Sequence, residues 1–85
     1  MITDNKETLI PLSMLPSGQS AQIISLEMTG GIKRRLLDLG LVPGTQTAVA
    51  FSSPMGDPSA YRVRGTTLAL RAKEAQLIMV RRLEL

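Results

Sequence analysis

The sequence predicts a small all-β domain, a partly open barrel of about five short antiparallel strands with one short helix inserted after the first strand. Three observations predict it: one segment has helical periodicity, several segments alternate between apolar and polar residues, and the connections are short and rich in glycine and proline. A chain of 85 residues has room for one domain with one modest core. Since Phe51 and Tyr61 are the only aromatic residues, that core must be aliphatic.

The one predicted helix lies within residues 29–44. Ile32, Leu36 and Leu39 recur at i, i+4 and i+7, which predicts that they line the side of the helix that faces the core. Residues of the opposite face are charged, and they are Lys33, Arg34, Arg35 and Asp38. The segment therefore predicts an amphipathic helix with a basic outer face.

Both ends of this helix carry recognisable signals. Thr29 is placed to cap the first turn. Gly40 can adopt the left-handed conformation that ends a helix, and the next residue, Leu41, can then pack back on the helix. Pro43 and Gly44 predict a turn, because proline presets φ at its first central position and glycine tolerates positive φ at the second.

The strands are expected at residues 21–28, 45–51, 59–64, 67–70 and 77–83, with a loop at 52–58 and one helical turn at 71–75. Because the connections are short, antiparallel pairing is expected. The in–out phase of the first strand is ambiguous, since Ile23 and Ile24 point to opposite faces unless a bulge intervenes. In the third strand Tyr61 and Val63 share one face, with arginines on the other. Residues 1–9 are predicted to be a flexible arm, with a short helical turn or extended segment between Leu9 and Leu15, and residues 10–85 to be the barrel domain.

Missing residue types restrict the chemistry. Without histidine or cysteine the usual nucleophile–base pairs cannot form, and the best ligands for iron, zinc or copper are absent. Neither a P-loop nor a dinucleotide-binding glycine pattern occurs. We therefore expect no enzyme, no cofactor and no metal site.

Other partner classes are judged from charge and apolar length. A net charge of +3 does not demand nucleic acid, and Tyr61, the one candidate stacking residue beside arginines, is expected to be buried. Apolar runs fall far short of the roughly 18 residues that a membrane span needs, and the first fifteen residues do not resemble a secretory signal. The expectation is a cytoplasmic protein that binds no nucleic acid and does not insert directly into a membrane.

Four motifs, in order, carry a resemblance to a known family: Arg35-Leu36-Leu37-Asp38-Leu39-Gly40-Leu41-Val42-Pro43-Gly44, Met55-Gly56-Asp57-Pro58, Val63-Arg64-Gly65 with Leu68-Ala69-Leu70-Arg71, and Glu74-Ala75. With these motifs the chain resembles the FeoA family over roughly residues 10–82. The resemblance implies an SH3-like barrel with a helix after the first strand. It also implies a role in bacterial ferrous iron uptake, with the FeoB-type membrane transporter as the partner and transition-metal involvement in the pathway.

Partner-binding residues are predicted where the core does not explain a side chain. One candidate is a partly exposed aliphatic pair, Leu37 and Leu41. The pair is bordered by the cations Lys33, Arg34 and Arg35, and this combination is typical of a small docking patch. A second candidate is Met55, because an apolar residue at a loop tip needs another surface to meet. The favoured function is a non-enzymatic adaptor that binds and modulates the transporter. The alternatives are a stand-alone SH3-like module that binds extended peptides and a metal-responsive regulator.

Overall fold

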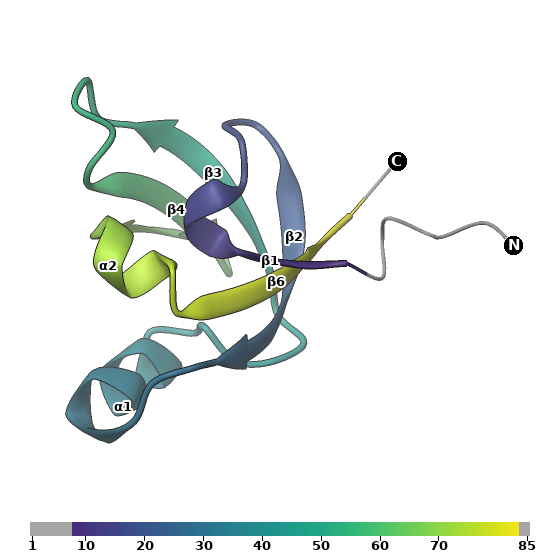
Figure 1. The fold of residues 1–85 in the computed structure, drawn as a ribbon, viewed down its shortest axis with the longest axis vertical. Helices are drawn as coiled ribbons and strands as arrows, with labels where there is room; N and C mark the ends of the chain where they lie inside the picture. Colours follow the sequence, from purple (N-terminus) through teal and green to yellow (C-terminus); the bar gives the residue numbers. More distant parts are fainter. Residues whose placement is uncertain (1–7, 84–85) are drawn as a thin grey trace, which may run out of the picture.

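Six antiparallel strands form one sheet that curls into an open barrel (Figure 1). The computed structural model describes residues 8–83. The strands are β1 (Leu9–Pro11), β2 (Ser20–Leu26), β3 (Gln46–Ser52), β4 (Ser59–Val63), β5 (Thr66–Leu70) and β6 (Ile78–Arg82), and the helices are α1 (Gly30–Asp38), α2 (Ala72–Ala75) and a 3-10 turn at Leu12–Met14. The order in the sheet is β1-β6-β2-β3-β4-β5, so β1 and β5 are its edges.

The predicted fold class is confirmed, with one strand more than expected. That strand is β1, which pairs with β6 and runs directly into the 3-10 turn, so the segment between Leu9 and Leu15 is both extended and helical. The predicted arm lies mostly outside the described residues, as do residues 84–85. None of the helices within residues 8–83 has the length and apolar character that crossing a membrane requires.

Two bulges set which side chains face the core. In β2 the register with β6 shifts between Ile23 and Ser25, which resolves the ambiguous phase: Ile23 is buried and Ile24 lies at the bulge. In β3 the register with β4 shifts between Val49 and Phe51. Val49 therefore faces the core, whereas Phe51 is 61% exposed and does not continue the inward alternation.

The turns follow their residue types. The amide N–H of Leu41 donates to the Leu36 carbonyl and that of Gly40 to the Leu37 carbonyl, both at 3.0 Å, with Gly40 at φ +109°. This pair of bonds is a Schellman motif, so the predicted helix end is confirmed. The Thr45 amide bonds the Val42 carbonyl at 2.9 Å across Pro43-Gly44, which confirms the predicted turn.

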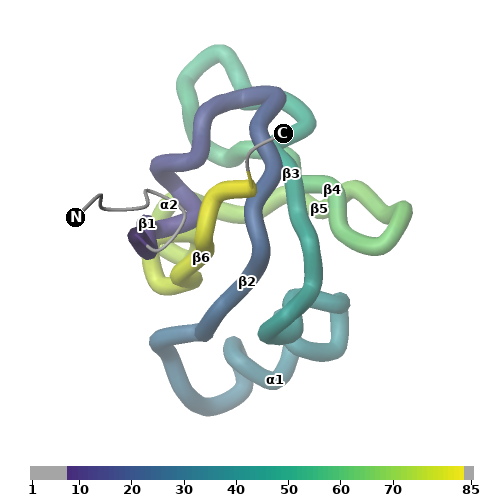
Figure 2. The backbone as a smooth tube through the Cα atoms, turned by 90° about the vertical axis from the view of Figure 1, so that its right-hand side faces the viewer, coloured from purple at the N-terminus to yellow at the C-terminus, as the bar shows by residue number. Residues whose placement is uncertain are grey.

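The core is aliphatic apart from Tyr61, which is 3% exposed. Of the helix α1 residues predicted to face it, Leu36 is fully buried, but Ile32 is 51% exposed and Leu39 40% exposed. That part of the prediction is wrong. The reason is the position of α1 at one end of the barrel (Figure 2), where Leu36 is the one residue of the helix that is buried.

Candidate functional site

Helix α1 projects at one end of the molecule, between the end of β2 and the start of β3 (Figure 2). Gly30 enters it at φ +78°, and Thr29 stands at the cap position in extended conformation. The Thr29 side chain makes no capping hydrogen bond, so the predicted cap has the right position without the expected bond. This helix is held mainly by its C-terminal motif and by burial of Leu36.

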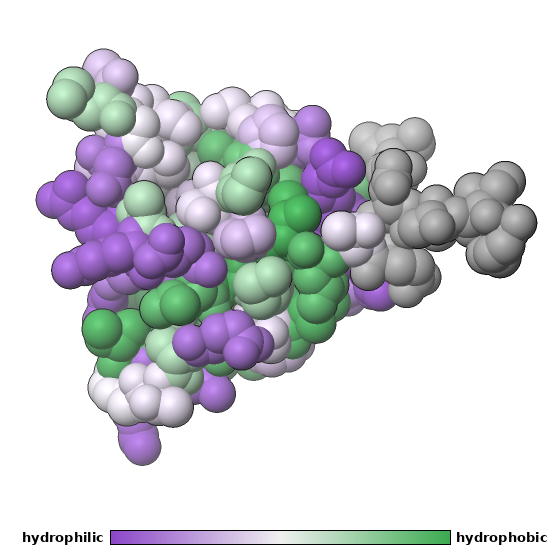
Figure 3. All heavy atoms as spheres, viewed as in Figure 1, coloured by the Kyte–Doolittle hydropathy of each residue, from purple (hydrophilic) through white to green (hydrophobic). Residues whose placement is uncertain are grey.

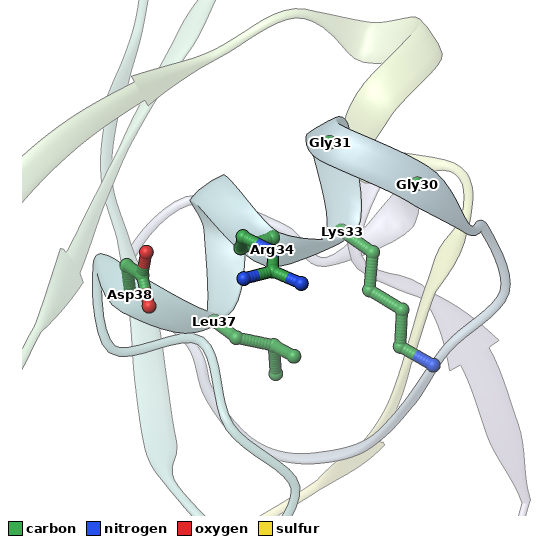
Figure 4. Close-up of a pocket in the computed structure, with 6 residues that line it drawn as sticks. All are labelled: Gly30, Gly31, Lys33, Arg34, Leu37 and Asp38. Carbon is green, nitrogen blue, oxygen red and sulfur yellow. The ribbon is translucent and has the colours of Figure 1, made fainter.

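A shallow hollow of about 500 Å³ lies along α1 (Figure 4). Its lining residues are Gly30, Gly31, Lys33, Arg34, Leu37 and Asp38. The Lys33 and Leu37 side chains extend from the same side of the helix, with Arg34 between them. Leu37 is half-buried and packs partly against the core, whereas Arg34 is exposed. Three of the predicted contact residues are thus brought together beside one hollow.

Arg35 points to a different neighbour. Its Nη2 atom lies 2.8 Å from Oε2 of Glu74, and the two side chains are 54% and 16% exposed. The other carboxylate oxygen of Glu74 accepts the backbone N–H of Arg71 at 3.2 Å, which caps α2. Arg35 therefore ties α1 to α2.

Leu41, predicted as a partner contact, is fully buried with 0% exposure. The cause is the Schellman motif, in which the residue after the glycine folds back onto the helix. Leu41 belongs to the core cluster with Leu36, and the prediction of a surface role for it is corrected.

Met55, the other predicted contact, is 89% exposed in the loop between β3 and β4. Figures 1 and 2 place this loop and α1 at opposite ends of the longest axis of the molecule. Met55 and the cations of α1 therefore belong to two separate surfaces.

A groove lies between α1 and α2, and the sequence did not predict it. It encloses about 390 Å³ and is lined by Met28, Thr29, Ile32, Lys73, Glu74, Gln76 and Leu77. Ile32 and Leu77 are 51% and 38% exposed, and Figure 3 shows apolar surface between the two helices with hydrophilic side chains around it. One signal was available: a nine-residue helix and its C-cap carry four aliphatic residues, Ile32, Leu36, Leu37 and Leu39, which is more than one small barrel end can bury.

These surfaces carry exposed side chains that another molecule can contact. Within residues 8–83 no group of three or more Asp, Glu, His or Cys side chains is arranged to hold a metal ion. Burial raises the pKa of Tyr61; the Ser59 side chain lowers it in part, and the nearby Asp57 carboxylate raises it further. Tyr61 lies in the core. Apolar side chains bordered by cations remain as the chemistry of the α1 end.

A family model described as the FeoA domain matches residues 10–82. The chain belongs to the FeoA family. Its barrel is of the SH3-like kind, as in the Stenotrophomonas maltophilia relative described below.

Solved structures of FeoA proteins superpose well on this chain. The FeoA protein from Chlorobium tepidum is 37% identical with a TM-score of 0.84, over 88% of this chain and 71% of that one. Stenotrophomonas maltophilia FeoA complexed with zinc, described as a procaryotic SH3 domain protein, is 36% identical with a TM-score of 0.73, over 81% of this chain and 86% of that one.

A curated relative joins two proteins in one chain. It is the Fe(2+) transport protein A/Fe(2+) transporter FeoB fusion protein of Porphyromonas gingivalis, 35% identical over 69 residues. The match covers 81% of this chain and 8% of the fusion protein, so this chain corresponds to a small part of that relative.

Proposed function

We propose that this FeoA-family chain is a non-enzymatic accessory protein of bacterial ferrous iron uptake, which works in the cytoplasm by binding the cytoplasmic part of a FeoB-type transporter. The observation that carries the proposal is the exposed aliphatic surface at the α1 end. The fusion protein of Porphyromonas gingivalis supports the choice of partner, because fusion in one chain keeps the two proteins together.

The proposed contact consists of the α1–α2 groove and the neighbouring hollow on α1. Ile32 and Leu77 are the apolar anchors, since each exposes more than a third of its surface in this groove. Lys33 and Arg34 border this surface and would steer it towards an acidic patch of the transporter. Leu37 contributes its exposed side.

Arg35 has a supporting part in this contact. Its guanidinium is bound to Glu74 at 2.8 Å, so it holds one wall of the groove in place. A partner that covered the groove would shield this ion pair from water and strengthen it.

A pulldown with the cytoplasmic part of the transporter tests the proposal. Ile32→Ser and the double variant Lys33→Glu/Arg34→Glu should each weaken capture, because they remove an anchor and reverse the steering charge. Met14→Ser is the matched control, since Met14 is 68% exposed in the 3-10 turn, outside the α1–α2 groove. Unchanged capture with both test variants would reject this surface as the contact.

The zinc complex of the Stenotrophomonas maltophilia relative favours a second candidate, a metal-responsive module. In this chain only carboxylates, carbonyls and thioethers could serve as ligands, because histidine and cysteine are absent. Titration calorimetry with zinc or ferrous ions at micromolar concentration separates the two candidates. Saturable heat at one ion per chain supports the metal-responsive module, and no heat leaves the adaptor.

A further inference from the structure

The outer side of the sheet carries arginines from two strands. Arg62 on β4 stands opposite Ala48 on β3, and Ala48 stands opposite Ser20 on β2. Two residues along β2, Gln22 stands opposite Arg81 on β6 and accepts a hydrogen bond from its guanidinium at 2.6 Å. Because paired residues and residues two apart share a face, these side chains all lie on the outer side.

Acidic residues are absent from this outer face within residues 8–83. They lie on the helices, on the segment before α1 and on the β3–β4 loop, and they are Glu27, Asp38, Asp57 and Glu74. The loop carboxylate is turned away, since Oδ1 of Asp57 accepts the backbone N–H of Ala72 at 2.9 Å. Every charged side chain on the outer face is therefore cationic in the described part of the chain.

Arg62 and Arg64 border a shallow hollow of about 240 Å³ on this face. Its other lining residues are small or neutral, namely Ser20, Gln46, Thr47, Ala48 and Gly65. Neither guanidinium has a carboxylate partner among the described residues. Two unpaired arginines beside a shallow polar hollow suit an anionic group, because the planar guanidinium matches the geometry of a phosphate.

Two large apolar side chains continue this face towards the β3–β4 loop. The bulge in β3 sets Phe51 opposite Ala60, which lies two residues before Arg62 on the same face of β4. Phe51 is 61% exposed, and Met55 in the loop that follows is 89% exposed. Neither side chain is part of the core cluster.

We propose that this face, made of Arg62, Arg64, Phe51 and Met55, docks on an anionic phospholipid membrane surface. The arginines contact headgroup phosphates while the two apolar side chains enter the interface beside them, and no segment spans the bilayer. Cations next to exposed apolar side chains are the combination that peripheral membrane proteins use.

A single-stranded nucleic acid is disfavoured as the occupant. Such surfaces stack bases on several aromatic rings next to cations. Here Tyr61 is buried, Phe51 is the only other aromatic residue, and Met55 offers a flexible thioether that suits an interface better than base stacking.

This membrane contact goes beyond the proposed binding of the transporter. None of the four residues of this face lines the α1–α2 groove or the hollow on α1, so the two surfaces can be tested with separate variants. Loss of one contact leaves the residues of the other unchanged.

Co-sedimentation of the full chain with phosphatidylcholine vesicles, with and without phosphatidylglycerol, tests the proposal. We expect binding only to vesicles with phosphatidylglycerol, decreasing as salt is raised. Each arginine near an anionic bilayer contributes roughly a factor of five, so Arg62→Gln/Arg64→Gln should weaken binding by about 25-fold. Phe51→Ser/Met55→Ser should also weaken it.

The matched control is Lys33→Gln/Arg34→Gln, which removes the same charge from α1 and should bind within about twofold of the unchanged chain. Because Arg64 has φ +52° and its stem lies near Gly40, Arg62→Gln alone is the second variant, with an expected loss of about fivefold. Circular dichroism verifies that each variant is folded.

Three results would overturn the proposal. One is the absence of binding to vesicles that contain phosphatidylglycerol. Another is an equal loss in the two charge variants, which would mean that net charge alone causes adsorption. The third is capture of single-stranded DNA at a salt concentration where these vesicles do not bind, which would assign the face to nucleic acid.

Discussion

The ion pair between Arg35 and Glu74 should couple the stability of α1 to that of α2. The two helices are separate in sequence, and the pair joins them at 2.8 Å beside the α1–α2 groove. Glu74 has a second bond, because it also accepts the backbone N–H of Arg71 at the start of α2. Replacing Glu74 with alanine therefore removes two interactions, whereas Arg35→Ala removes one.

The expected magnitudes follow from exposure. An exposed ion pair contributes about 0.2 to 1 kcal/mol, and the low exposure of Glu74, at 16%, favours the upper end of this range. Arg35→Ala should lower the free energy of unfolding by about 1 kcal/mol. Glu74→Ala should lower it by about 2 kcal/mol, since a lost helix cap costs about 1 kcal/mol more. The double variant should also lose about 2 kcal/mol, because the shared ion pair is counted once.

Urea denaturation of the four proteins measures this coupling. The double-mutant cycle should give an interaction energy of about 1 kcal/mol that decreases as salt is added. Lys73→Ala is a suitable control, because Lys73 is exposed and forms no ion pair among the described residues. Losses that simply add, with no coupling within error, would show that the pair does not join the helices and would refute this reasoning.

Three further predictions concern the turns and the core. Gly40→Ala should lower the free energy of unfolding by about 2 to 4 kcal/mol and Gly44→Ala by only about 1 to 2 kcal/mol. Both glycines have positive φ, but a Cβ at Gly40 would also lie 3.3 Å from buried Val63. Equal losses in chemical denaturation would contradict this reasoning. Leu41→Ala should lower the free energy of unfolding by about 2 to 5 kcal/mol, because Leu41 is fully buried. An unchanged melting temperature would instead mean that Leu41 serves only as a partner contact. Burial raises the pKa of Tyr61 above its ordinary value of 10.0, so the contribution of Tyr61 to stability should be constant below pH 10 and be lost as the pH rises further. Tyr61→Phe should lose this alkaline decline in a pH series of denaturation curves.

Local signals predicted the C-terminal end of α1 and the turn after it well. Gly40 and the Pro43-Gly44 pair specify their backbone conformation through their own covalent structure, with little help from distant residues. The hydrogen bonds that follow, from Leu41 to Leu36 and from Thr45 to Val42, are short-range in sequence. Such features are readable from sequence because the energy that decides them is local.

The faces of the strands and of α1 depended on partners that the sequence does not reveal. The bulge that turns Phe51 outward arises from the register of β3 against β4. Helical periodicity alone placed Ile32 and Leu39 towards the core, but how much of a helix is covered depends on where it sits on the barrel. Met55 was predicted as a second contact for the same partner as the α1 cations, and its place at the opposite end of the molecule follows from the three-dimensional path of the chain.

The small buried area of α1 bears on its role. A helix of nine residues is marginal on its own, and here only Leu36 is fully withdrawn from water. Its remaining support is the Schellman motif and one ion pair, while Ile32 and Leu39 stay exposed. A segment kept only to complete the barrel would gain stability if these aliphatic residues were buried or replaced by polar ones. Ile32 lines the groove, which makes sense if a partner covers it. Such a partner adds apolar contacts that the isolated chain lacks, so binding and the ordering of α1 should reinforce each other.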